Sequence, residues 1–458
     1  MTQKRTSGFM ERWFTTPSIT WAQSRDILLP HVAEHLFTVL FGLINTGMIS
    51  ASGVTSLSAV SLVDTLNNFL FVFFVGISTG ASVVVANYRG RGDQAKLHEA
   101  SVQAVTSVTL FTLLTTLFIM LFNRPLLTLL FGAVEEDVMN KARLYLLGGS
   151  ITLPFLGVPR AICGVLRGIG EGKTSLKFTV ISTSSYVVFN VLFLTVLRLG
   201  IPGLILSITL NRVVDVIVLL WLMRKSHSQF QFNIREFFRI DFGILRSIMR
   251  VGLPCAMEQL FFTGGRLVTQ TIIVPMGTNA IVTYNISYSI MLLNQAFASP
   301  LNTAMFSITG ICMGNRRPQD VRRLTKAYIV LNSVVYVGVG ALVLLCFGQL
   351  VSFYHAPAEA VPLIWQCVLI TAAVHPFMHA IGFTLPSVFR AVGDGLYCTV
   401  ATLAIMWVVR VLGGYLLGTV AGMGVLGVWI AMVLDWVVRC VMFPLHYRGE
   451  RWLKHQVV

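Results

Sequence analysis

Charged side chains that can carry acid–base chemistry stand inside long apolar stretches of this 458-residue chain. Five carboxylates lie in such stretches: Glu34, Asp64, Asp215, Glu258 and Asp435. An ionisable group inside a membrane is costly, and by default it marks an ion or substrate pathway. These residue types therefore predict proton or cation handling, with a structural ion pair as the alternative at each position.

Two of the carboxylates have an arginine within reach on the same helix. Asp435 and Arg439 are four residues apart, and Arg212 and Asp215 are three apart. Residues at these spacings meet on one helix face. We expect a structural, charge-neutralising role for both pairs rather than a role in transport.

Glu34 and Glu258 each lie one turn after a proline, near the start of an apolar run. Each could pair with a loop arginine, or it could be a protonatable carboxylate that lines a cleft. His379 lies one turn after His375, beside Pro376. A histidine titrates near neutral pH, so His379 could exchange protons, and a hydrogen-bonded packing role is the alternative.

The segment from His31 to His35 reads HVAEH, which matches a zinc-peptidase string. A catalytic zinc site needs three protein ligands and a water-filled open position. The corresponding segment 224 residues later, PCAMEQ, keeps the glutamate and has neither histidine. The seven cysteines are scattered through apolar segments without a CxxC pair. We therefore expect no metal site, no disulfide framework and no cofactor.

The elements that would position these groups are membrane-spanning helices. The chain is 55% hydrophobic and only 12% charged, with a mean hydropathy of +0.76, whereas soluble domains carry about 25% charged residues. Apolar runs long enough to cross a bilayer core of about 30 Å recur along the chain. We expect helices, which satisfy their own backbone in lipid, at twelve places: 29–50, 60–87, 101–123, 144–166, 178–198, 201–223, 251–274, 281–312, 327–349, 361–388, 396–418 and 424–446.

The two halves of the chain repeat each other. LPHVAEHLF, which begins at Leu29, returns as LPCAMEQLF 224 residues later, and LRGIGEG, which begins at Leu166, returns as FRAVGDG 223 residues later. An internal duplication is a common plan of secondary transporters, and six spans in each half make the repeats parallel. The expected organisation is a lead-in (1–28), a first lobe (29–223), a linker (224–250), a second lobe (251–446) and a tail (447–458).

The net charge of +15 is concentrated on alternate loops. Basic residues precede the first span, follow the second, fourth, sixth and eighth spans, and end the chain, whereas an acidic cluster at 135–137 lies on an opposite loop. This pattern predicts a multi-pass protein of the plasma membrane, the inner membrane in a bacterium, with both termini in the cytoplasm. A nucleic-acid-binding protein would instead gather its charge on one surface, so no nucleic-acid partner is expected.

Four segments taken together resemble the multidrug and toxic compound extrusion (MATE) transporters. They are GISTGASVVVANYRGRGD from Gly76, LRGIGEGKTS from Leu166, FRAVGDG from Phe389 and GVWIAMVLDWVVRCVMF from Gly427. The resemblance runs over the whole chain. It implies an all-α membrane protein with two six-helix lobes around a V-shaped cleft. It also implies export of organic, often cationic, compounds against an inward flow of protons or sodium ions.

The chain departs from this family where many members carry aspartates. Asn45 stands where a first-helix aspartate is common, and Asn190 is followed by Leu194 in place of another aspartate. Some members carry an aspartate eleven residues before the loop arginine, and counting back from Arg390 gives His379. We therefore expect the second lobe to handle protons, with Glu258 first and Glu34 in support. The candidate coupling residues are Glu258, His379, Glu34, Asn45 and Asn190.

The function expected is a secondary active antiporter, not an enzyme, that exports amphipathic, cationic organic compounds by alternating access. The coupling ion is a proton or sodium, and the protein is expected to act as a monomer in the lipid bilayer. The alternatives are a flippase of a lipid-linked precursor, which Arg160 and Arg266 keep open, and a membrane-embedded enzyme. The candidate cleft residues are Phe37, Asn67, Asn68, Asp64, Phe262, Arg266, Tyr284, Tyr288, Asn294 and His375.

Overall fold

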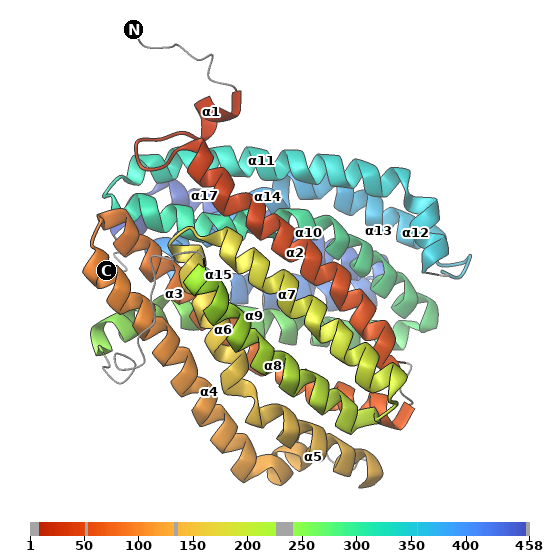
Figure 1. Cartoon of the computed structure of the whole chain (residues 1–458). Coiled ribbons are helices and arrows are strands. Elements are labelled where there is room, and N and C mark those ends of the chain that lie inside the picture. The colour runs from red at the N-terminus through yellow and green to blue at the C-terminus, as the bar shows by residue number, and fades with distance from the viewer. Residues whose placement is uncertain (1–8, 51–53, 132–135, 226–240, 355, 455–458) are drawn as a thin grey trace. The chain divides into compact units, whose positions relative to one another are not determined.

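The computed structural model describes residues 9–50, 54–131, 136–225, 241–354 and 356–454, and within these ranges the chain is almost entirely helical. The helices of the first half are α1 (Phe9–Phe14), α2 (Trp21–Ser50), α3 (Val54–Arg91), α4 (Gln94–Phe131), α5 (Glu136–Ile151), α6 (Leu153–Gly168), α7 (Gly172–Asn190), the π-helix η1 (Val191–Val196) and α8 (Gly200–Lys225) (Figure 1).

The second half repeats this order. It contains α9 (Phe242–Ile273), η3 (Val274–Met276), α10 (Thr278–Gly314), α11 (Pro318–Leu345), α12 (Phe347–Phe353), α13 (Val361–Val374), the π-helix η4 (His375–His379), α14 (Ala380–Val392), α15 (Gly395–Ala404), the π-helices η5 (Ile405–Leu412) and η6 (Leu416–Val420) on either side of α16 (Gly413–Tyr415), α17 (Gly424–Arg448) and η7 (Arg451–Lys454).

The expected spans are confirmed as helices, and most of them are long and apolar enough to cross a membrane. Nine helices in the described ranges meet this test, and the pair α5 and α6, bent by 48° at Thr152, makes a tenth if it counts as one span. The expected span at 144–166 is therefore broken. The two remaining expected spans lie in α2 and α9, the first long helix of each half, and α9 carries Glu258 and Arg266.

The residues from Leu29 to Ala256 form one compact unit. Its core lies between α3, α4, α5, α6 and α8, with Phe74, Tyr145 and Leu153 almost fully buried. The hydrogen bonds of Glu34 to α7 place α2 beside α7, and Figure 1 shows α7 lying along α8. The first turns of α9 belong to this unit too, because an added Cβ on Gly80 of α3 would lie 2.3 Å from the backbone oxygen of Ile248.

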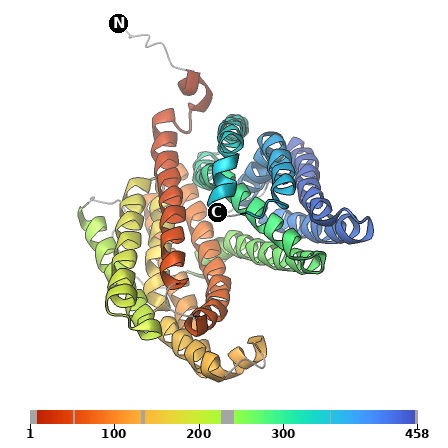
Figure 2. The same cartoon turned by 90° about the vertical axis from the view of Figure 1, so that its right-hand side faces the viewer.

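The second unit contains Met257–Val457 together with Met1–Leu28. Its core is aromatic: Trp429 and Trp436 of α17 are 0% and 1% exposed and pack against α10 and α13. The helices of this unit from α10 onward run from green to blue in Figure 2. The lead-in docks on α11, where the Ser18 backbone nitrogen donates to Asp320 at 3.1 Å and the Phe14 ring packs edge-on against Tyr328. The lead-in thus packs with the second half.

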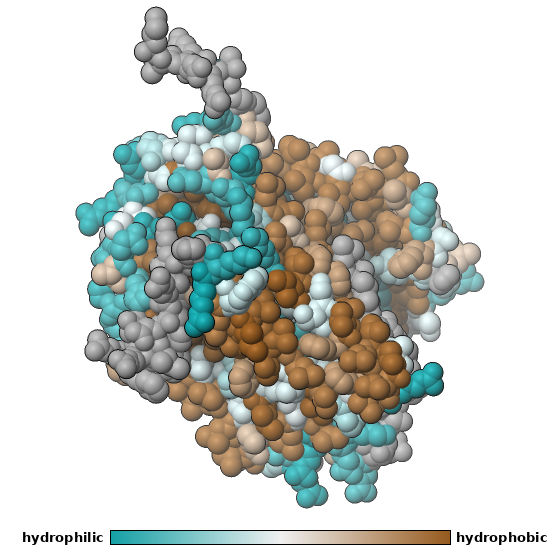
Figure 3. All heavy atoms as spheres, viewed as in Figure 1, coloured by the Kyte–Doolittle hydropathy of each residue, from teal (hydrophilic) through white to brown (hydrophobic). Residues whose placement is uncertain are grey.

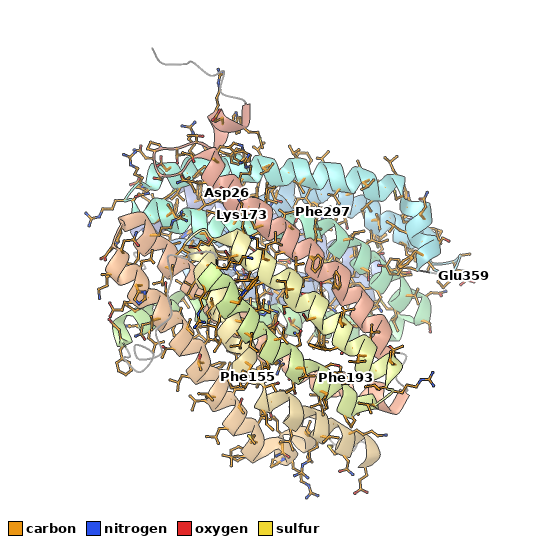
Figure 4. The ribbon with its side chains drawn as sticks, in the orientation of Figure 1. Asp26, Phe155, Lys173, Phe193, Phe297 and Glu359 are labelled. Carbon is orange, nitrogen blue, oxygen red and sulfur yellow. The ribbon has the colours of Figure 1, made fainter. Side chains whose placement is uncertain are left out.

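Large apolar side chains cover the outer helix faces. On α7, η1 and α8 they include Val188, Val196, Ile217 and Trp221, and Figure 3 shows a broad apolar surface over these helices. Figure 4 marks Lys173 near the start of α7 and Phe193 in η1, which continues from the other end of α7. Exposed apolar faces of this extent belong in lipid. The protein is therefore an integral, multi-pass membrane protein.

Candidate functional site

The candidate site is a cavity of about 260 Å³ inside the second unit. Helix α10 supplies one wall, because Tyr288, Met291, Gln295, Ser299 and Asn302 recur at helical spacing on a single face. Thr303 and Phe306 extend this wall along α10. The remaining lining residues come from six other elements: Glu258, Gln259 and Phe262 of α9, Tyr336 of α11, His379 of η4, Phe383, Ser387 and Arg390 of α14, Arg410 of η5 and Trp436 of α17.

Glu258 projects from α9 into this cavity and forms an ion pair there. Arg390, at the end of α14, donates through Nη2 to the Glu258 carboxylate at 2.7 Å. The side chains of the two residues are only 12% and 14% exposed. A partly buried carboxylate with one cationic partner can exchange that partner for a proton or for another cation.

His379 lines the same cavity with both ring nitrogens in hydrogen-bond contact. Its Nδ1 lies 2.8 Å from the Tyr336 hydroxyl, and its Nε2 lies 3.0 Å from the Gln295 amide nitrogen. The ring stacks on Phe383 at 3.8 Å. A neutral imidazole with one partner at each nitrogen loses no hydrogen bond, and the Tyr336 hydroxyl can donate or accept as the tautomer requires. His375 packs against the rings of Tyr336, His379 and Trp436 and is 0% exposed, so it is part of the packing around the cavity.

The first unit contains the duplicate of the Glu258 ion pair. Arg167 donates to Glu34 at 3.3 Å, and the Thr179 hydroxyl donates to the same carboxylate at 2.9 Å. The partner arginines Arg167 and Arg390 match in the two halves, and each begins the turn in which a glycine, Gly170 or Gly393, takes a positive φ. Of the two interpretations offered by the sequence, pairing with an arginine is therefore observed for both glutamates.

Of the two ion pairs predicted within single helices, the one between Asp435 and Arg439 is formed. Arg439 donates to Asp435 at 2.7 Å with both side chains fully buried, as the four-residue spacing predicts. Arg212 and Asp215 form no direct ion pair in the described part of the chain, although the two charges interact electrostatically. Arg212 instead donates to the Gly149 carbonyl at 2.8 Å and to Thr152, at the bend between α5 and α6. The Gly149 carbonyl also accepts from the Thr152 backbone nitrogen at 3.2 Å, so the arginine adds to the hydrogen bonds that hold this bend.

The other predicted cleft residues divide into three groups. Phe262 and Tyr288 line the cavity, and the exposed Arg266 lies over the Tyr288 ring at 4.7 Å. Tyr284 and Asn294 are buried in helix packing, at 3% and 2% exposure. In the first unit, Phe37 stacks on Phe41, Asn67 is half-buried, and Asn190 is fully buried where α7 ends. The side chains of Asn45, Asp64 and Asn68 lie outside the described residues.

Several lining residues were missing from the predicted site. Gln295, Tyr336, Phe383 and Trp436 complete the surroundings of His379, and Arg410 adds a second cation to the cavity wall. A signal for Gln295 was present, because it lies seven residues after Tyr288 and therefore on the same helix face. No comparable signal marks Tyr336 or Trp436, since buried aromatic residues are frequent in helix cores.

Among the described residues, no group of three or more histidine, cysteine or carboxylate side chains is placed to hold a metal ion. In the HVAEH segment, Glu34 is engaged by Arg167 and Thr179. The ion pair of Glu258 and Arg390 in the cavity wall can bind and release protons and charged groups.

The chain matches one family model twice. The model, described as MatE, covers residues 30–192 and again 254–416. The chain belongs to the MatE family. The two matches also confirm the internal duplication, and the membership confirms the predicted resemblance to the MATE transporters. As a MATE transporter, the protein has the two-lobe, twelve-helix organisation that the sequence predicted.

Known MATE relatives match this chain over nearly its full length. A Thermotoga maritima protein named "Probable multidrug resistance protein NorM" is 23% identical over 94% of this chain and 93% of its own. "Multidrug resistance protein MdtK" of Yersinia enterocolitica is 20% identical, over 95% and 96%. A solved structure described as an outward-facing conformation of a multidrug resistance MATE family transporter superposes with a TM-score of 0.84 at 20% identity, covering 97% of this chain and 98% of that chain. At this identity the structural likeness concerns the fold alone.

Proposed function

We propose that this MATE protein is a secondary active antiporter that exports amphipathic, cationic organic compounds in exchange for protons. It acts as a monomer in the plasma membrane, with both termini in the cytoplasm. Family membership and the names of the relatives support drug export, and the basic residues on alternate loops support the orientation. The observation that carries the proposal is the Glu258 carboxylate in the wall of an aromatic cavity.

The role of Glu258 follows from its ion pair with Arg390. Arg390 neutralises the carboxylate at 2.7 Å, and a proton or a substrate cation can replace that interaction. Because proton and cation neutralise the same oxygen atoms, they compete for one site. A ligand shifts a conformational equilibrium only through its different affinity for the two states, and exclusive occupation of Glu258 supplies that difference for an antiporter.

His379 is the second proton-binding group of the proposal. It lies in the same cavity, and its ring can gain or lose a proton through the Tyr336 hydroxyl. A charged imidazole would add to the positive charge of nearby arginines, whereas a proton on Glu258 removes a charge. We therefore assign the main coupling role to Glu258 and a tuning role to His379.

The first unit supports transport without supplying the main proton site. Glu34 is held by Arg167, Ser175 and Thr179, so protonation there would break several hydrogen bonds. Asn45 and Asn190 cannot titrate. We propose that Asn45, like Phe37 and Asn67, contacts the organic part of the substrate, and that the fully buried Asn190 supports the end of α7.

Transport into inside-out vesicles tests this function, with the pH gradient and the sodium gradient imposed separately. A fluorescent aromatic cation is the probe. We expect the probe to accumulate inside the vesicles when their interior is acidic, and not to accumulate when only a sodium gradient is imposed. Accumulation that requires sodium and ignores the pH gradient would show that the coupling ion is wrong.

A flippase for a lipid-linked precursor is the second candidate, and one observation favours it. Two arginines, Arg390 and Arg410, line the cavity, and cationic walls suit a phosphate-bearing headgroup. Expression in a host without its drug pumps separates the two functions. Increased tolerance to aromatic cations supports the exporter, whereas unchanged tolerance with rescue of a flipping defect supports the flippase.

A further inference from the structure

Arg410 is a buried arginine whose charge has no acidic partner in the part of the chain that the structure describes. Its side chain is 1% exposed, it lines the cavity, and its Nε and Nη2 atoms make no hydrogen bond there. Burying a guanidinium without a hydrogen-bonded counter-charge destabilises the folded protein by several kcal/mol. A ligand in the cavity that supplies the missing hydrogen-bond acceptor would offset this cost.

The carboxylates around Arg410 are engaged by other arginines. Glu258 pairs with Arg390 at 2.7 Å, and Asp435 pairs with Arg439 at 2.7 Å. The interaction that Arg410 does make is with the Phe262 ring, whose centroid lies 5.3 Å from its guanidinium carbon. A ring stabilises one face of the guanidinium but accepts no in-plane N–H hydrogen bond. The hydrogen-bonding edge of Arg410 therefore remains available.

The backbone around Arg410 is unusual in a way that fits a ligand site. Residues 405–412 form the π-helix η5, and π-helical turns inside α-helices are frequent at functional sites. Trp407 and Val408 of this segment are 40% and 61% exposed, whereas Met406 and Arg410 are buried. The local geometry thus turns the arginine into the cavity and the apolar residues outward.

We propose that this cavity binds the carboxylate of an aromatic compound, with Arg410 as the anion-binding residue. A guanidinium binds a carboxylate through two parallel N–H···O bonds, and Phe262, Phe383 and Trp436 provide flat apolar walls for a ring. The volume of about 260 Å³ lies just below the roughly 300–1,000 Å³ of pockets for drug-sized ligands. It therefore fits a single-ring acid or the acidic end of a larger zwitterion.

This inference rests on the proposed function in one respect, since it takes the bound carboxylate to be part of an exported compound. The charged groups that face the site are Glu258, His379, Arg390 and Arg410, with the Asp435–Arg439 pair behind them. In a zwitterionic compound the cationic end competes with the proton for Glu258 while the carboxylate binds Arg410, so exchange for protons is retained. Benzoate has no cationic end, and protonation of Glu258 removes a negative charge near it. Benzoate consequently binds more tightly as the pH falls, whereas a purely cationic ligand binds less tightly.

Ligand binding to the purified full-length protein tests the site without any gradient. Sodium benzoate, benzyl alcohol and sodium chloride are compared at constant ionic strength by thermal unfolding and tryptophan fluorescence, since Trp436 lines the cavity. Benzoate is expected to raise the unfolding midpoint, because a ligand that binds only the native state stabilises it. Benzyl alcohol, the neutral analogue, is expected not to do so. An equal response to chloride would identify an inorganic anion as the occupant and overturn the proposal.

Variants at Arg410 complete the test. Arg410→Gln is expected to bind benzoate about tenfold or more weakly, through the loss of charge-assisted hydrogen bonds, and to be no less stable than the wild type without ligand. Arg410→Lys keeps the charge without the two-point geometry, and intermediate affinity is expected. Arg448→Gln removes one exposed charge from the end of α17 and is the control with unchanged binding. Wild-type benzoate affinity in Arg410→Gln, or in Arg410→Lys if the glutamine variant does not fold, would overturn the assignment.

A failure of this site and a failure of proton coupling give different results. Benzoate binding in detergent requires no antiport, so it persists in a protein whose transport is driven by sodium. Conversely, if the protein exports in response to a pH gradient but does not bind benzoate when purified, the proposed function stands and the proposed anion site is refuted.

Discussion

At the residue scale, the two glutamates of the duplication share a partner type but differ in surroundings. Glu34 accepts hydrogen bonds from Arg167, Thr179 and Ser175, whereas Glu258 is held by Arg390 and faces a cavity. Both contacts therefore join the first long helix of each half to the end of the helix that carries the arginine, α6 or α14. Glu258 also faces the cavity, and the coupling role that we propose for it depends on that access.

His379→Asn changes the group that we propose tunes proton release. Asparagine can keep hydrogen bonds to Tyr336 and Gln295 but cannot take up a proton. We expect transport to continue with a flatter pH dependence, because one proton-binding group has been removed. The measurement is the initial transport rate as a function of pH. An unchanged profile would make His379 a packing residue.

At the element scale, the close packing of α3 on α9 depends on glycine. An added Cβ on Gly80 would lie 2.3 Å from the Ile248 backbone oxygen and 2.7 Å from the Gly252 nitrogen. Because these are backbone atoms, the two helices would have to separate. Pro254 follows directly, so the same stretch of α9 also lacks one helical hydrogen bond.

Gly80→Ala is therefore expected to destabilise the protein by about 1–3 kcal/mol, as overpacking in a core does. Gly338→Ala in α11, where an added Cβ meets nothing within 4 Å, is the matched control and should be neutral or slightly stabilising. Thermal unfolding of the purified variants measures both. Equal unfolding midpoints for the two variants would contradict the close contact.

Asp241 caps the start of α9 outside the membrane. Its carboxylate accepts from the backbone nitrogens of Ile244 at 3.1 Å and Gly243 at 2.7 Å. The hydrogen bond from Ile244 and that from Gly243 hold the pKa of Asp241 below its ordinary value. A lowered carboxyl pKa gives stability that is present above the unfolded-state pKa and is lost as the pH falls through the folded-state pKa.

Asp241→Ala should consequently lower stability by about 1 kcal/mol at neutral pH. The difference from the wild type should shrink as the pH falls below about 4, where the wild-type carboxylate becomes protonated. Unfolding midpoints at pH 7 and pH 3.5 measure it. A pH-independent difference would show that the cap does not act through the carboxylate charge.

At the scale of the whole molecule, the charge pattern predicts which ends of the helices face the cytoplasm. Glu136 at the start of α5 and Lys173 near the start of α7 should lie on opposite sides. A cysteine at Glu136 should react with an impermeant thiol reagent in intact cells, and one at Lys173 should not. Arg239, predicted on the same side as Lys173, lies outside the described residues. Labelling of the wild type measures the background from the partly exposed native cysteines Cys346 and Cys440. Reversed labelling of the two introduced cysteines would refute the orientation.

Much of the architecture could be predicted from the sequence because it depends on two simple regularities. Apolar runs specify the spans, and the 224-residue offset specifies the repeat. Asp435 and Arg439 were predictable because a four-residue spacing fixes a helix face. The contact of Arg212 was not predictable, since its partner, the Gly149 carbonyl, lies at a bend near Thr152 that the apolar run does not reveal.

The cavity itself was only partly predictable. Glu258, Phe262, Tyr288 and His379 were named in advance, whereas Arg410 was not among the predicted site residues. The side that Arg410 faces depends on the π-helical turn of η5, and a 3.6-residue period cannot predict that turn. Tertiary packing likewise decides that Tyr284 lies in the core beside Trp429 and not on the cavity.

Proton-driven transport by Glu258→Gln tests the central claim most directly. Purified wild type and variant are placed in proteoliposomes, with Glu359→Gln, an exposed carboxylate near the start of α13, as the control. The account predicts that Glu258→Gln still exchanges labelled for unlabelled substrate but no longer accumulates it in response to a pH gradient, while Glu359→Gln behaves as the wild type. Wild-type accumulation by Glu258→Gln would show that Glu258 is a structural residue and that protons are coupled elsewhere.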